Sequence, residues 1–75
     1  MSDRPFRARD RIIVHWEDGR TAKGRVICHN RRDKYGHAII VLYETATGNE
    51  ITESFKPDGR KYLSDRDKTY ITHSD

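Results

Sequence analysis

The sequence has a single cysteine, Cys28, among its 75 residues, and it has no long hydrophobic run. One cysteine forms no intramolecular disulfide, so these residues cannot build the disulfide framework typical of small secreted domains. The longest apolar stretch covers only residues 38–43, and no apolar segment opens the sequence. We therefore expect neither a signal peptide nor a membrane-spanning helix, and we expect the protein in the reducing cytoplasm.

Apolar side chains are also scarce, since hydrophobic residues make up 33% of the sequence and charged residues 36%. A chain of this size buries only about 60% of its unfolded surface, so its core must be small. The apolar residues are nevertheless gathered in short runs rather than spread evenly. This clustering indicates a folded domain instead of a disordered chain.

Short runs with the composition of β-strands recur along the sequence, and no long window favours a helix. The runs cover residues 11–16, 23–29, 37–44, 50–56 and 69–73. Turn signals lie between most of them, at Asp18-Gly19, Tyr35-Gly36, Gly48-Asn49 and Pro57-Asp58-Gly59. The pattern predicts an all-β fold, and we expect a small five-stranded antiparallel barrel.

The chain length and the position of the strand runs indicate one domain over residues 10–72. A flexible basic arm is expected over residues 1–9, and a frayed end over residues 73–75. Residues 30–36 are polar and are expected to form a loop between two strands.

The predicted core follows from the alternation of side chains along the strand runs. Gly24 lies inside a run and indicates a bulge or a tight bend. Residues 38–43 are apolar throughout, which indicates a central strand covered on both faces, and Cys28 is expected to be a small buried residue. The predicted core residues are Ile12, Val14, Val26, Ile40, Leu42, Ile51, Phe55, Leu63 and Ile71.

The excess of positive over negative charge is confined to the first half of the sequence. Residues 1–36 hold ten lysines and arginines against five acidic residues, whereas residues 37–75 hold five against seven. An asymmetry of this kind indicates a polyanionic or acidic partner. The alternative is that mixed charge only keeps a small domain dissolved.

Nucleic-acid binding requires cations near the phosphates and, for single strands, flat side chains on which bases can stack. If the runs 11–16 and 23–29 pair, Arg11 and Arg25 reach the same surface. No base-reading pattern is present, so we expect binding without sequence specificity, with a solvated charged surface as the alternative. The candidate binding residues, for nucleic acid or a protein partner, are Arg4, Arg7, Arg9, Arg11, Lys23, Arg25, Arg31, Arg32, Lys34, Tyr35 and Trp16.

Catalysis and metal binding have little support in the sequence. Asp65 and Asp67 lie in a charged segment that we expect to be exposed, not in a pocket that could hold two carboxylates a defined distance apart. Cys28 and His29 are neighbours in a strand and point to opposite faces, so they cannot act as nucleophile and base. No CxxC or HxxxH spacing is present. We expect a non-catalytic protein without a metal or another cofactor.

Two segments resemble known families. In ARDRIIVHWEDGRTAKGRVICHN an Asp precedes an Ile/Val-rich strand, an Asp-Gly turn follows, and a Gly-x-Val strand comes next. This layout resembles Src-homology-3-like small β-barrels of the Tudor and KOW type. The segment ESFKPDGRKYLS resembles small uncharacterised phage and prophage proteins.

The two resemblances imply different partners. Tudor-type barrels bind partners through aromatic residues at one end of the barrel, and the aromatics available here are Trp16, Tyr35, Tyr43 and Tyr62. A phage-type protein implies a small regulator that docks on a host protein such as RNA polymerase and modulates it. We expect the protein to be a monomer. Nucleic acid and an acidic protein surface both stay open as the primary ligand.

Overall fold

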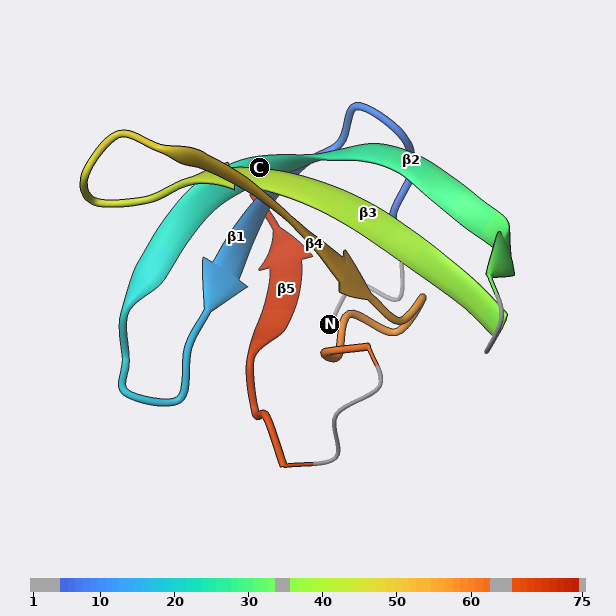
Figure 1. The fold of residues 1–75 in the computed structure, drawn as a ribbon. Helices are drawn as coiled ribbons and strands as arrows, with labels where there is room; N and C mark the ends of the chain where they lie inside the picture. The colour runs from blue at the N-terminus through green and yellow to red at the C-terminus, as the bar shows by residue number, and fades with distance from the viewer. Residues whose placement is uncertain (1–4, 34–35, 63–65, 75) are drawn as a thin grey trace.

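The computed structural model describes residues 5–33, 36–62 and 66–74, without the side chains of residues 32 and 33. Its strands are β1 Arg11–His15, β2 Thr21–Asp33, β3 Gly36–Glu44, β4 Glu50–Phe55 and β5 Tyr70–His73 (Figure 1). They form one antiparallel sheet in the order β4-β3-β2-β1-β5. The predicted all-β class with five antiparallel strands is confirmed. The described residues include no helix that could cross a membrane.

Strands β2 and β3 are longer than the sequence suggests. Residues 30–36 were expected to form a loop, but β2 continues to Asp33 and β3 begins at Gly36, with these two residues paired. The loop prediction is therefore wrong over most of this segment. An exposed two-stranded ribbon satisfies its backbone groups through its partner strand, so polar side chains suit it as well as they suit a loop.

The core lies on the inner face of the sheet and differs in part from the predicted set. Ile40 and Leu42 are only half-buried and Ile51 is 39% exposed, so these three predictions are wrong. The expectation that both faces of the strand over residues 38–43 are covered is also wrong, because Ile40 and Leu42 on its outer face are only half-buried. Leu63 lies outside the described residues. The observed buried hydrophobic residues are Phe6, Ile12, Val14, Val26, Ala38, Ile39, Val41, Tyr43, Phe55 and Ile71.

A bulge in β2 exposes the cysteine. Val26 pairs with Val41 and Cys28 pairs with Ile40, so Ile27 is an extra residue on β2 without a partner on β3. The extra residue shifts the side chains of Cys28, His29 and Asn30 to the opposite face from the one that strict alternation after Val26 would give them. Cys28 is exposed as a result, and the prediction that it is buried is wrong.

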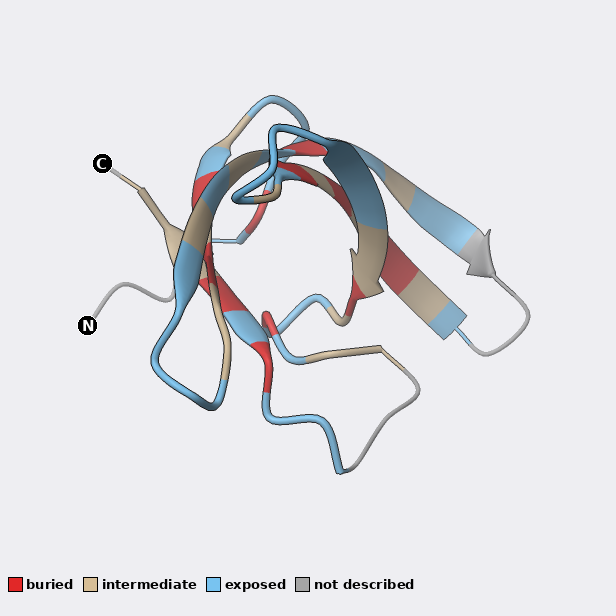
Figure 2. Ribbon diagram, turned by 60° about the vertical axis from the view of Figure 1, so that its left-hand side comes forward, coloured by how far each residue is buried: buried red, intermediate tan, exposed pale blue. Residues whose placement is uncertain are grey.

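The sheet curls around its core (Figure 2), and Gly24 makes the curl possible. A Cβ atom at this position would lie 2.4 Å from the Leu42 carbonyl oxygen and 2.9 Å from the Tyr43 Cβ. Only glycine allows β2 to approach β3 this closely. The register runs unbroken through Gly24 on both sides, so the predicted bulge does not lie there, and the predicted tight bend stays a prediction.

The outer strands β4 and β5 are linked by the segment between them. Phe55 forms a single bridge with Lys61, and Arg60 forms one with Tyr70. Within the described residues β4 and β5 do not pair directly, so the expected closure into a barrel stays a prediction.

Both described ends of the chain pack against the sheet. Phe6 is only 8% exposed, and its ring stacks on the His73 ring with a centroid distance of 4.2 Å. The Arg9 N–H donates to the Val26 carbonyl, and the Ser74 N–H donates to the Arg11 carbonyl. The buried Phe6 ring and these hydrogen bonds hold parts of residues 5–9 and 73–74 against the sheet, whereas the flexible arm over residues 1–9 and the frayed end over residues 73–75 stay predictions.

Replacing Gly24 by alanine is expected to lower the free energy of unfolding by about 1–3 kcal/mol, because the added methyl group has no space against β3. Urea unfolding measures this change. The matched control is Lys23→Gln on the exposed face of the same strand, which should change stability by less than about 0.5 kcal/mol. A Gly24→Ala protein as stable as the wild type would show that the curl does not depend on this contact.

Candidate nucleic-acid interface

Three of the predicted cations lie together on the outer face of β1 and β2. Arg11 is directly opposite Arg25, and Ile13 is directly opposite Lys23, one step along the same face. The side chains that alternate with them, such as Ile12, are buried in the core, so Arg11, Lys23 and Arg25 point outward and are exposed. We call these three residues the β1–β2 cationic face. The expectation that Arg11 and Arg25 share a surface is confirmed.

The cationic face is only partly neutralised by neighbouring acids. Its three cations line a shallow hollow of about 330 Å³ that Glu44 and Glu50 also line, at the edge formed by β3 and β4. No ion pair links the three cations to an acid within the described part of the chain. Like charges directly opposite each other in a sheet are destabilising. An anion bound between or beside the two guanidinium groups would therefore relieve the repulsion between Arg11 and Arg25.

The other predicted arginines lie elsewhere. Arg7 and Arg31 line a separate, mostly apolar hollow of about 600 Å³, which shares no lining residue with the cationic face. Arg9 is exposed and adopts a positive φ of 76° where the chain turns into β1. Arg4, Lys34, Tyr35 and the side chain of Arg32 lie outside the described residues. The structure thus brings together three of the predicted cations and not the whole set.

A histidine pair lines the apolar hollow beside Arg31. The His29 Nδ1 and the His37 Nε2 lie 2.7 Å apart, so the two rings share one hydrogen-bonding proton. Desolvation, followed by the charges of His29 and Arg31, lowers the pKa of His37. Two histidines fall short of the four ligands of a structural zinc site. No group of three His, Cys, Asp or Glu residues suited to a metal occurs among the described residues.

Trp16 belongs to a third surface. Its ring meets the Tyr43 ring edge-on at 5.3 Å, and the Arg20 guanidinium lies over it, 5.8 Å from the ring centroid. Arg20 also forms an ion pair with Asp18, with an N–O distance of 2.6 Å. A groove of about 480 Å³ runs beside Trp16 and Tyr43 and reaches Ala46. We call it the Trp16 groove.

The structure also places cations in a region that sequence reasoning missed. A polar hollow of about 480 Å³ opens between the segment after β4 and the start of β5. We call it the 56–71 hollow. Its charged lining residues are Lys56, Asp58, Arg60, Lys61, Asp67 and Lys68. The second half of the sequence has a net negative charge, so the sequence did not indicate this cluster. In the structure Glu44 and Glu50 lie at a different edge of the sheet, away from these cations.

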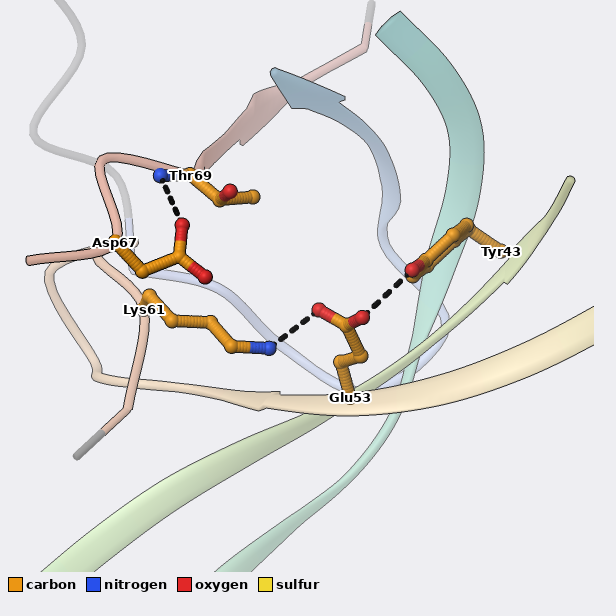
Figure 3. Close-up of polar contacts among 5 residues, drawn as sticks. All are labelled: Tyr43, Glu53, Lys61, Asp67 and Thr69. Atoms are coloured by element: carbon orange, nitrogen blue, oxygen red, sulfur yellow. Dashed lines mark hydrogen bonds and ion pairs between the residues drawn. The ribbon is translucent and has the colours of Figure 1, made fainter. Parts of the chain in front are cut away.

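One cation of this hollow is already neutralised (Figure 3). The Lys61 ammonium donates to the Glu53 carboxylate at 2.5 Å, and the Tyr43 hydroxyl donates to the other oxygen of Glu53 at 2.7 Å. The Asp67 carboxylate accepts the Thr69 N–H, and hydrogen bonds from Thr69, with the nearby Lys61 charge, lower the pKa of Asp67. Lys61 is thus a structural cation, and Arg60 lies 3.8 Å from Asp58, which leaves Lys56 and Lys68 as the lysines of the hollow without an ion pair in the described part of the chain.

Comparisons with known protein families, curated proteins and solved structures gave no match. The function must therefore be argued from the arrangement of the residues themselves.

Burial and the adjacent Glu53 carboxylate raise the pKa of Tyr43 to about 12, against about 10 in an unfolded chain. The protonated phenol is favoured in the folded state, so its contribution to stability is fully present below about pH 10. That contribution declines as the pH rises from about 10 to about 12. Denaturant unfolding across this range, compared with Tyr43→Phe, should show the decline in the wild type and a smaller one in the variant. Ionisation of Tyr43 near pH 10 in the folded protein, followed by NMR, would contradict this account.

Proposed function

We propose that this protein is a non-catalytic module that binds nucleic acid without sequence specificity through the β1–β2 cationic face. The observation that carries the proposal is the direct juxtaposition of Arg11 and Arg25, with Lys23 next to them. Each cation placed near a phosphate releases condensed counterions, and this release is the main source of non-specific affinity. The exposed position of these side chains on the outer face of the sheet, around a shallow hollow, suits contact with a long polyanion rather than with a small enclosed ligand.

We also propose that the curled sheet closes into the small barrel that the sequence indicates. The bridges of Phe55 with Lys61 and of Arg60 with Tyr70 support this closure, since they connect the edges of β4 and β5 through residues 60 and 61. A cytoplasmic location agrees with the proposed ligand and with the exposed free thiol of Cys28.

A protein partner is the second candidate, and the Trp16 groove is the observation that favours it. This groove combines a half-exposed tryptophan with the small side chains of Ala22 and Ala46. Aromatic anchors in apolar grooves dominate the energetics of protein interfaces. A phage-type regulator would use this surface to dock on a host protein such as RNA polymerase.

The two candidates separate in a pull-down from nuclease-treated lysate. Loss of every partner after nuclease treatment supports nucleic acid as the primary ligand. A partner that survives the nuclease and is lost in Ala46→Arg, which fills the Trp16 groove without entering the core, supports protein docking instead.

Replacing Arg25 by glutamine is expected to weaken binding to labelled DNA severalfold at low salt. It should also reduce the slope of log affinity against log salt by about 0.7–0.9, the contribution of one phosphate contact. Fluorescence anisotropy at several salt concentrations measures both quantities. The matched control is Arg20→Gln, which removes the same charge at Asp18 and Trp16. Equal effects of the two substitutions, or no binding by the wild type at low salt, would contradict the proposal.

A further inference from the structure

An exposed aromatic ring lies on the same outer face as the proposed interface. Tyr70 is 45% exposed although its ring stacks on the His15 ring, with a centroid distance of 4.7 Å and an interplanar angle of 9°. The His15 Nε2 lies 2.8 Å from the Thr72 hydroxyl, a hydrogen bond that holds the imidazole in this orientation. His15 therefore covers one face of the Tyr70 ring and fixes its plane, and the exposed surface of Tyr70 lies away from His15.

The strand register connects Tyr70 to the β1–β2 cationic face. Tyr70 pairs with His15, and one step along the same face Thr72 pairs with Ile13, which in turn pairs with Lys23. The following row holds the two arginines of the cationic face. Successive rows on one face of a sheet lie about 6.7 Å apart. The outer face of β2, β1 and β5 is thus a continuous surface with an aromatic end and a cationic end.

Cations lie on the other side of the ring as well. Arg60 is the bridge partner of Tyr70, so their side chains leave the same face, and both residues line the 56–71 hollow with Lys56 and Lys68. Arg60 shares its charge with Asp58, at 3.8 Å, and Asp67 accepts the Thr69 N–H, whereas Lys56 and Lys68 form no ion pair within the described residues. Tyr70 is therefore the exposed ring between two groups of basic side chains.

We propose that this surface binds single-stranded nucleic acid, with one base stacked on the Tyr70 ring and the adjoining phosphates near Lys23 and Arg60. This inference rests on the proposed function and specifies its ligand. An unpaired base would continue the His15–Tyr70 stack, whereas the bases of a duplex have no free face to offer. Stacking is tolerant of base identity, which agrees with binding that lacks sequence specificity.

The test compares a labelled single-stranded DNA of mixed sequence with the same strand annealed to its complement, both at low salt. Tyr70→Ala is expected to weaken binding of the single strand about tenfold and to leave duplex binding unchanged. Tyr70→Phe keeps the ring and should bind both forms like the wild type. Thermal unfolding of the variants checks that the exposed position tolerates the change.

A second measurement needs no variant. The ring protons of Tyr70 should shift upfield when the wild-type protein is titrated with the single strand, because a stacked base shields them. Unchanged ring shifts, or equal losses of single-strand and duplex binding in Tyr70→Ala, would overturn the stacking inference and leave the proposed function standing. Failure of the wild type to bind either form at low salt would overturn the proposed function and this inference with it.

Discussion

The close contact between Gly24 on β2 and the backbone of β3 is the constraint on which the rest of the structure depends. Because glycine has no Cβ, the backbone of β2 can lie close against the Leu42 carbonyl oxygen and Tyr43 of β3, and the sheet can curl. The curl gives a short chain a concave side that holds its few apolar residues. It also gives an outer side on which Arg11 and Arg25 stand next to each other.

The core and the proposed interface are two faces of the same strands, so one register determines both. On β1, Ile12 and Val14 fill the core while Ile13 and His15 face outward beside β2 and β5. A slip of one residue would bury the charges and expose the core, which makes the outer arrangement as well specified as the inner one. Phe6, stacked on His73, adds apolar contact where the sheet alone has little.

Turn chemistry and side-chain alternation were enough to predict five antiparallel strands and the shared surface of Arg11 and Arg25. The sequence could not show which side chains of β3 face the core. An apolar run without alternating polar residues does not distinguish Ile39, which points inward, from Ile40. The bulge at Ile27 has no sequence signal, and it decides the exposure of Cys28. The position of Tyr70 beside the cationic face could not be predicted, because it depends on the pairing of β5 with β1, which are far apart in the sequence.

The most direct test of the account is an NMR titration of isotope-labelled protein with single-stranded DNA at low salt. The account predicts that the amide shift changes concentrate on β1, on the first half of β2 and on β5, and that they vanish as salt is added. Changes confined to the Trp16 groove or to the hollow around His29 and His37, or no changes at all, would contradict the claim that the outer face of β2, β1 and β5 is the binding surface.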